Sequence, residues 1–207
     1  MPEMTFAQRT PEWLAARRGK ITASLAAACL RIGPPKARKS AQAAWREIMG
    51  CQTEAEKRHA EEGFELRYGI NFEPIARNCY EAESGNLVTE TGFWTHPNLP
   101  WLGASPDGLV GRDGLLECKC LVRTPASVPH HHRVQCLVQL ACTGRAWVDY
   151  FVWPHPDSGD APRTWRIHRC GGIVGLILKL DQFRRDYILT GVCPPRKAWR
   201  THQDRGQ

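Results

Sequence analysis

The sequence predicts one α/β domain whose central mixed β-sheet is flanked by helices on both sides. Segments with apolar residues at helical spacing alternate with short apolar runs that are typical of strands. No internal repeat and no linker-like stretch divides residues 1–207, and a chain of this length can bury one well-formed core. This order of elements fits helices packed on both faces of one sheet.

The composition is that of a globular, basic protein. Apolar residues make up 42% of the chain, which argues against disorder. The formal net charge is +7 and there are eight Trp residues. A basic, Trp-rich surface suits a polyanionic partner, although a merely soluble basic protein carries the same charge.

The cysteines and the apolar runs predict a cellular compartment. The nine cysteines are odd in number and form no regular framework. No signal-like segment begins the chain, and its longest candidate apolar run, residues 173–178, is far shorter than a membrane span. We therefore expect a cytoplasmic protein with free, mostly buried thiols and no membrane partner.

The first third of the chain predicts mainly helices. Thr10 is a good N-cap for a helix over residues 10–18, and Gly19 is a natural stop. A second helix is expected over residues 20–30, followed by a loop over 31–39. The start of that second helix, beside basic residues, is either a phosphate site or ordinary capping. A third helix is expected from Ser40.

The next segments predict two more helices and a strand. Residues 54–66 are polar and predict a solvated helix. Residues 72–81 predict an amphipathic helix with Pro74 in its first turn, and residues 84–86 end it. Residues 87–94 predict a strand, and residues 96–100 a loop.

A hairpin over residues 103–119 carries the residues with the clearest chemistry. Asp107-Gly108 and the turn at residues 111–114 predict two short strands. Because side chains alternate along a strand, Glu117 and Lys119 point to one face and Cys118 to the other. If Asp107 lies on the same side, two carboxylates and an ammonium converge, which suits a hard divalent cation and phosphodiester hydrolysis. Ordinary turn chemistry at Asp107 and a solvated strand face remain alternatives.

The second half of the chain predicts a helix, two strands and a further helix. Residues 123–132 predict an irregular basic loop, with His130, His131 and His132 facing phosphate or solvent. Residues 134–141 predict a helix with Gln135 and Gln139 one turn apart on one face. The remaining expected elements are a buried strand over 146–153, an exposed strand over 165–169, a helix over 175–189 and a basic tail from Pro194.

A zinc site is a rival hypothesis. Cys118 and Cys120 could join a histidine of the run at 130–132, but structural zinc sites usually take Cys pairs with two or more intervening residues. An iron–sulfur cluster is excluded, because Cys170 and Cys193 are too few and too far apart.

Four motifs occur together and in order, and their combination resembles a known family. They are Trp13 with residues 17–24, Gly69 with residues 73–77, residues 103–108 with 117–119, and residues 134–135 with 143–147. This pattern is similar to that of the phage lambda exonuclease and YqaJ-type viral recombinase nucleases, in the PD-(D/E)XK superfamily. The resemblance covers about residues 10–153, whereas residues 154–207 carry no motif that we transfer.

The resemblance implies a restriction-endonuclease-like core and an activity. Members digest one strand of duplex DNA from its 5′ end and leave 3′ overhangs for phage-type recombination, with Mg²⁺ or Mn²⁺ as cofactor. By resemblance, Asp107 and Glu117 are metal-binding carboxylates and Glu73 is a further acidic residue at the metal. Lys119 is the water-orienting base, and Gln135 faces the site from its helix.

The resemblance also implies DNA contacts and partners. Arg17 would bind the DNA 5′-phosphate, with Ser24 and Ser105 as further polar contacts. Expected partners are double-stranded DNA ends, a single-strand annealing protein and further copies of the chain in a ring-shaped trimer. The family implies a phage or prophage origin and the bacterial cytoplasm.

Two other functions are compatible with the same residues. An endonuclease or nickase could use this fold and site, because neither sets the dependence on DNA ends. A non-catalytic DNA-binding module is the third possibility, but the intact set of Asp107, Glu117 and Lys119 argues against it.

Overall fold

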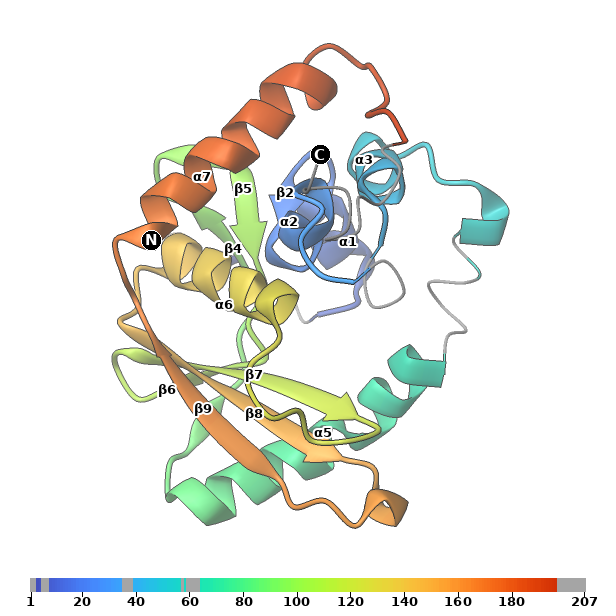
Figure 1. The fold of residues 1–207 in the computed structure, drawn as a ribbon. Helices are drawn as coiled ribbons and strands as arrows, with labels where there is room; N and C mark the ends of the chain where they lie inside the picture. Colours follow the sequence, from blue (N-terminus) through green and yellow to red (C-terminus); the bar gives the residue numbers. More distant parts are fainter. Residues whose placement is uncertain (1–2, 5–7, 35–38, 57, 59–63, 197–207) are drawn as a thin grey trace, which may run out of the picture.

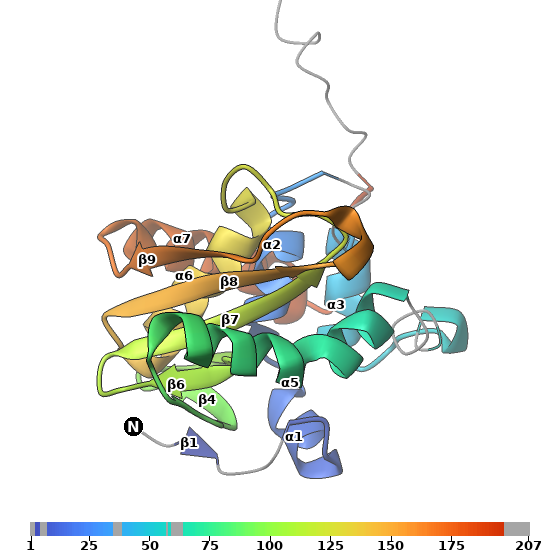
Figure 2. The same cartoon turned by 90° about the horizontal axis from the view of Figure 1, so that it is seen from below.

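The computed structural model describes residues 3–4, 8–34, 39–56, 58 and 64–196, and these form two sheets with helices around them. The larger sheet has the strand order β3-β6-β7-β8-β9 and the smaller has the order β1-β4-β5-β2. Helix α6 lies over one face of the larger sheet, and α5 runs along its opposite face (Figures 1 and 2). The expectation of a mixed sheet with helices on both sides is confirmed.

The strands are short apart from the two at the centre of the larger sheet. Their bounds are β1 Glu3–Met4, β2 Ile21–Thr22, β3 Val88–Thr89, β4 Phe93–His96, β5 Leu99–Ala104, β6 Gly108–Val110, β7 Gly114–Leu121, β8 Trp147–Pro154 and β9 Arg163–His168. The helices are α1 Pro11–Arg17, α2 Ala23–Cys29, α3 Ala41–Met49, α5 Phe64–Ser84, α6 His130–Thr143 and α7 Gly172–Phe183, with a 3₁₀ turn at Pro156–Ser158 and a π turn at Arg184–Ile188.

The predicted hairpin and the crossover that follows it form the centre of the fold. Strands β6 and β7 are antiparallel, with Leu109 opposite Leu115, and Gly111 at the turn has φ +52°. Strands β7 and β8 are parallel and place Glu117 beside Tyr150. Parallel neighbours need a long crossover connection, and α6 supplies it. The crossover therefore brings α6 over the face of β7.

Helix α6 is buried because it packs on two sides. Its residues Val134 and Val138 join a core formed with α2, α3 and α7, whereas Cys136 and Leu140 pack on the larger sheet. On the opposite sheet face, Ala76 and Tyr80 of α5 pack with Cys118 and Phe151. Cys118 therefore points away from α6, as the alternation along the strand predicts.

The expected second helix begins three residues later than predicted. Ile21 and Thr22 form strand β2, which pairs in parallel with Leu102 and Gly103 of β5. Both residues are β-branched and buried, which favours a strand, and Thr22 then precedes α2 as its N-cap. The first helix follows the prediction, because the Thr10 side chain accepts a hydrogen bond from the backbone N–H of Trp13.

The proline-containing helix is much longer than predicted. Helix α5 runs for 21 residues, and Pro74 lies inside it rather than in its first turn. A proline there removes one backbone hydrogen bond, but burial of Ala76 and Tyr80 against the sheet favours continuing the helix. The expected polar helix over 54–66 lies partly outside the described residues, at 57 and 59–63.

The predicted strand over residues 87–94 is two strands in different sheets. Strand β3 pairs with β6, and β4 pairs with β5 through the turn at residues 97–98. Residues 99–100, expected in a loop, belong to β5. A pattern of apolar residues cannot show this division, because both pieces have strand character and only the pairing partner differs.

The C-terminal part follows the predicted order. Strand β9 pairs with β8, and α7 continues through the π turn to Ile188. The basic tail from residue 197 lies outside the described residues. Within the part of the chain that the structure describes, no helix is long and apolar enough to cross a membrane.

Candidate active site

The structure brings Asp107, Glu117 and Lys119 together at the β6–β7 hairpin. The Nζ atom of Lys119 lies 2.5 Å from Oε1 of Glu117, whose side chain is 1% exposed. Asp107 lies beside β7, where its Oδ2 accepts a hydrogen bond of 2.8 Å from the backbone N–H of Cys118. The predicted convergence of two carboxylates and one ammonium is therefore present in the geometry.

Two glutamines of α6 hold the Glu117 carboxylate. The side-chain amide of Gln135 donates to Oε1 over 2.6 Å, and that of Gln139 donates to Oε2. The two glutamines lie one helical turn apart, so both reach the same strand residue. Sequence reasoning placed them on one face but did not include Gln139 among the site residues.

The electrostatics of the cluster favour a cation. Burial, and then the charges of Glu117 and Glu73, raise the pKa of Asp107 well above its ordinary value. Burial opposes the charge on Lys119, but Glu117 and Asp107 outweigh it and raise the pKa of Lys119. Lys119 is therefore a protonated donor in this structure, able to orient a water.

Glu73 is held by arginines rather than joined to the carboxylate pair. Its Oε2 lies 3.0 Å from Nη2 of Arg9, and its Oε1 lies 3.6 Å from Nη2 of Arg77. Among the described residues, no group of three His, Cys, Asp or Glu side chains could hold a metal ion. The Glu73 carboxylate is thus paired with two arginines, although its charge still acts on Asp107.

The remaining oxygen donors still fit a hard divalent ion. Mg²⁺ commonly binds through one or two carboxylates and completes its shell with water and substrate phosphate. Asp107 and Glu117 supply oxygen ligands. The raised pKa of Asp107 comes first from burial and then from the charges of Glu117 and Glu73, and a bound cation would oppose both effects. Zinc does not fit, because Cys118 faces α5 while the histidine run belongs to α6.

The predicted phosphate-binding residues form a chain of contacts next to this cluster. The Arg17 guanidinium lies 4.2 Å from the ring centroid of Trp13 and 3.4 Å from Oγ of Ser24. The indole N–H of Trp13 donates to Oγ of Ser105 over 2.9 Å, two residues before Asp107. A cavity of about 600 Å³ adjoins Arg17 and includes Arg18 and Lys20 in its lining.

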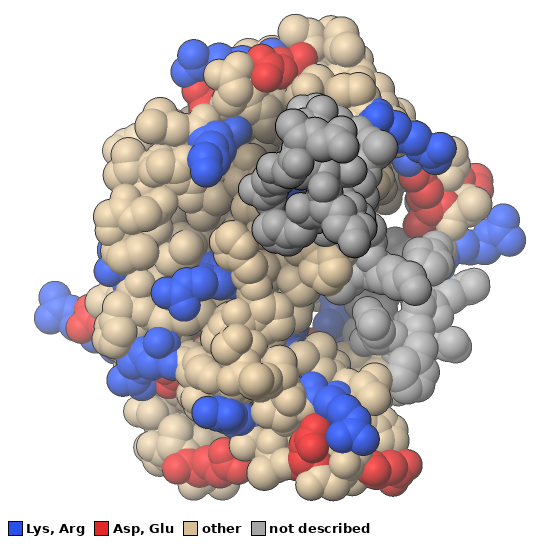
Figure 3. Space-filling model, viewed as in Figure 1, with Lys and Arg blue, Asp and Glu red and all other residues tan. Residues whose placement is uncertain are grey.

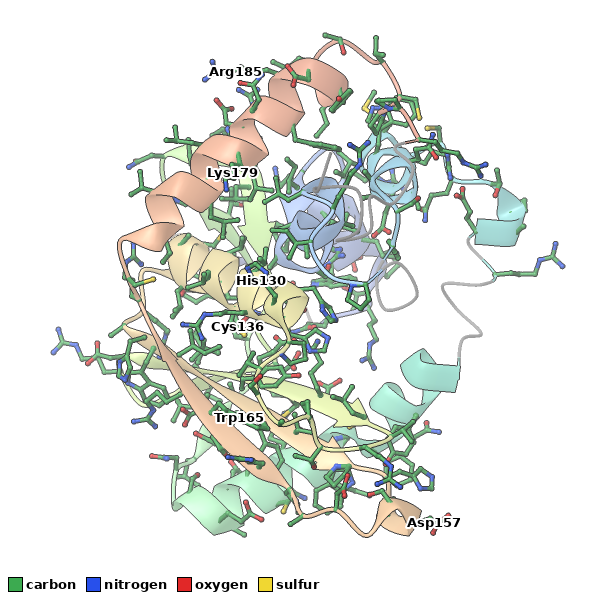
Figure 4. All side chains as sticks on the ribbon, viewed as in Figure 1. His130, Cys136, Asp157, Trp165, Lys179 and Arg185 are labelled. Carbon is green, nitrogen blue, oxygen red and sulfur yellow. The ribbon has the colours of Figure 1, made fainter. Side chains whose placement is uncertain are left out.

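The histidine run was predicted in a loop, but it forms the first turn of α6 (Figure 4). Nδ1 of His132 lies 2.6 Å from the hydroxyl oxygen of Tyr150. Burial, and then the charge of Lys119, lower the pKa of His132 to about 2, so the imidazole is neutral. Sequence reasoning placed His132 in a loop and did not single out Tyr150, because their meeting depends on the register of β8 and the start of α6.

A comparison with protein-family models decides which family the chain belongs to. The family model of the YqaJ-like viral recombinase domain matches residues 12–146. The chain belongs to this family. The match includes Arg17, Asp107, Glu117 and Gln135, and it ends before Tyr150 and β9.

Solved structures agree with the YqaJ-like assignment. An alkaline exonuclease (LHK-Exo) from Laribacter hongkongensis is 30% identical, with a TM-score of 0.69 over 88% of this chain and 94% of that chain. The same exonuclease in complex with dAMP gives a TM-score of 0.70 at the same identity and coverage. A phage-related exonuclease from Haemophilus somnus, 14% identical with a TM-score of 0.54 over 82% of this chain and 93% of that chain, supports the fold alone. No curated protein matches the chain.

On the face of this YqaJ-like chain that Figure 3 shows, surface charge does not mark out the site. On the face in Figure 3, Lys and Arg side chains are spread over several elements and interspersed with Asp and Glu. The site is defined instead by the local cluster at the hairpin, which combines the buried Glu117 with the half-buried Asp107 and Lys119.

Proposed function

We propose that this chain is a metal-dependent exonuclease that digests one strand of double-stranded DNA in the 5′→3′ direction and leaves 3′ overhangs. The observation that carries the proposal is the cluster of Asp107, Glu117 and Lys119, fixed from α6 by Gln135 and Gln139. The likeness to an alkaline exonuclease that has been solved with dAMP supports a deoxyribonucleotide substrate.

Asp107 and Glu117 would hold Mg²⁺ or Mn²⁺. When bound there, such an ion would lower the pKa of a water and offset negative charge on the phosphate. Glu73 would take part through a water or after release from Arg9, which is 51% exposed and could move away. The two glutamine amides keep Glu117 in place, so its carboxylate does not have to reorganise when the substrate binds.

Lys119 would orient the attacking water. Its ammonium is protonated and paired with Glu117, so it donates hydrogen bonds from a fixed position. The attacking water gives one proton to solvent as its oxygen forms a bond to phosphorus, and the P–O3′ bond breaks. The departing O3′ gains a proton, and the remaining strand keeps a new 5′-phosphate, which is the substrate for the next cycle.

Arg17, Ser24 and Ser105 would bind the terminal 5′-phosphate and so set the direction. Arg17 is stacked on Trp13, which holds its guanidinium in one orientation, and Trp13 is tied to Ser105. A planar guanidinium with hydroxyl groups nearby suits a phosphate monoester. Further proposed partners are an annealing protein and two other copies in a ring around DNA, in a bacterial cytoplasm.

The test compares linear duplex DNA with 5′-phosphate or 5′-hydroxyl ends in Mg²⁺ and in EDTA. We expect mononucleotide release from phosphorylated ends in Mg²⁺, abolished in Asp107→Asn and Lys119→Met and unchanged in Lys179→Met, an exposed control on α7. Arg17→Ala is expected to remove the preference for 5′-phosphate. Cleavage of closed circular DNA would instead assign an endonuclease, and tight binding without cleavage would assign a DNA-binding module.

A further inference from the structure

The pair formed by His132 and Tyr150 adjoins the proposed nuclease site without belonging to its ligand set. His132 lies one turn before Gln135 on α6, and Tyr150 lies beside Glu117 in the sheet register. Their side chains are joined by the 2.6 Å contact between Nδ1 and the phenolic oxygen.

The direction of this hydrogen bond follows from burial. Tyr150 is 0% exposed, and a phenol, whose ordinary pKa is about 10, keeps its proton at neutral pH. A buried hydroxyl proton needs an acceptor, and Nδ1 of His132 is the acceptor that the structure provides. An imidazole that is neutral and accepts at Nδ1 carries its own proton on Nε2.

His132 also lines a cavity of about 200 Å³ between α2 and α6. Ser24, a predicted phosphate contact, and Gln135, which holds Glu117, line the same cavity. The other polar lining residues are Lys39 and His131, and a Cβ atom added at Gly33 would lie only 2.9 Å from Cβ of His131, so this wall is closely packed. Hydroxyl, amide, imidazole and ammonium groups together suit an anion.

We propose that His132 is a substrate-contacting residue: Tyr150 holds its imidazole in the Nε2–H form, and this N–H donates a hydrogen bond to a phosphate oxygen of the DNA strand in the cavity between Ser24 and Gln135. The inference rests on the proposed nuclease function and adds a neutral donor to the cationic contacts. A neutral donor releases no counterion, so its contribution to affinity does not depend on salt, whereas that of Arg17 does.

The experiment uses His132→Phe, His132→Gln and Tyr150→Phe in the full chain. His132→Phe keeps a ring but has no donor, and the amide of glutamine can replace the Nε2–H donor. His130→Phe is the matched control, because His130 is exposed in the same helical turn. The measurements are kcat/KM in Mg²⁺, the Kd for a 5′-phosphorylated duplex in EDTA at two salt concentrations, and the melting temperature.

We expect His132→Phe to raise Kd about tenfold, and the factor should be the same at both salt concentrations. We also expect it to lower kcat/KM about 10- to 100-fold. His132→Gln is expected to recover most of both losses. Tyr150→Phe is expected to weaken binding less than His132→Phe, and the double variant to be no worse than His132→Phe alone. His130→Phe is expected to match the wild type.

Wild-type affinity in His132→Phe would overturn the inference. So would equal losses in His132→Gln and His132→Phe with a lowered melting temperature, because the role would then be structural. If the wild type binds the duplex but does not cleave it, the proposed function fails. The His132 contact is then decided by the Kd values alone, so the two failures are distinguishable.

Discussion

The side-chain amide of Gln139 donates a hydrogen bond to Oε2 of Glu117, and the amide and the carboxylate are both almost completely buried. The amide oxygen of Gln139 has no hydrogen-bond partner within the described structure. An unpaired buried carbonyl is unfavourable, so the glutamine stabilises the carboxylate at the expense of its own oxygen. This balance is typical of a residue that serves a site rather than the stability of the fold.

Gln139→Leu therefore separates function from stability. The leucine removes the donor and the unpaired oxygen together, and Glu117 keeps Gln135 and Lys119 as partners. We expect the free energy of unfolding to change by less than about 1 kcal/mol, and cleavage to fall at least tenfold because Glu117 is less well fixed. Urea unfolding and mononucleotide release measure the two quantities. Full activity in Gln139→Leu would contradict this assignment.

The raised pKa of Asp107 predicts how pH and metal affect stability. In the metal-free folded state Asp107 binds its proton more tightly than in the unfolded chain, whose pKa is about 3.9. The protonated Asp107 side chain therefore contributes to the stability of the folded state below the unfolded-state pKa. This contribution is lost as the pH rises through the higher pKa of the folded state. Asp107→Asn is thus expected to melt at a higher temperature than the wild type in EDTA, by a margin that grows from pH 4 to pH 8.

Adding Mg²⁺ is expected to reverse that difference at pH 8. The ion binds the carboxylates of the wild type and raises its melting temperature, whereas Asp107→Asn gains little. Thermal melts of both proteins with EDTA and with Mg²⁺ provide the measurement. A wild type whose melting temperature ignores Mg²⁺ would contradict the metal assignment.

Arg166 is expected to matter for stability without serving the site. Its Nε and Nη2 each lie 2.8 Å from a carboxylate oxygen of Asp149, which also accepts the Tyr80 hydroxyl at 2.7 Å. Arg166→Met leaves the 3% exposed Asp149 without its cation and is expected to cost about 3 kcal/mol. Arg163→Met on the same strand is the control, because its guanidinium lies over Trp165.

Activity assays complete this comparison. Asp149 alternates with Tyr150 along β8 and so points to the sheet face opposite the site. We expect Arg166→Met to keep wild-type cleavage at a temperature where it remains folded. Loss of cleavage in the folded variant would show that the two sheet faces are coupled.

Gly108 lies where the neighbouring strand leaves no room for a side chain. A Cβ atom there would lie 2.1 Å from Cγ1 of Val88, a stiff β-branched side chain. Gly108→Ala is expected to cost about 1–3 kcal/mol by overpacking. Gly171→Ala, with no atom within 4 Å of the added Cβ, is the control and is expected to be neutral. Chemical denaturation of both variants tests this difference.

The chemistry of the site was predictable wherever it depends on neighbours in the chain. Glu117 and Lys119 share a strand face because side chains alternate, and Gln135 and Gln139 share a helix face because they are four residues apart. What the alternation could not indicate is that these two faces meet. That depends on the crossover of α6, which packs against two cores at once.

The predictions of local structure that were wrong failed because contacts between distant parts of the chain outweighed local signals. Pro74 marks a helix start by local rules, but burial of α5 against the sheet extends the helix on both sides of it. The strand over residues 87–94 divides because its two halves find partners in different sheets. The place of Glu73 at the metal stays a prediction, and its pairing with Arg9 and Arg77 is a contact that the spacing of residues does not indicate.

By itself the sequence determined the fold class, the hairpin with its acidic and basic residues, and the family, because all of these depend on local spacing and on residue identity. The tertiary structure decided that Tyr150 meets His132, that Gln139 reaches Glu117 and that Glu73 is held by arginines. Such contacts join residues up to 64 positions apart in the chain. They follow from packing of whole elements, in which many weak contacts fix the register that places each side chain.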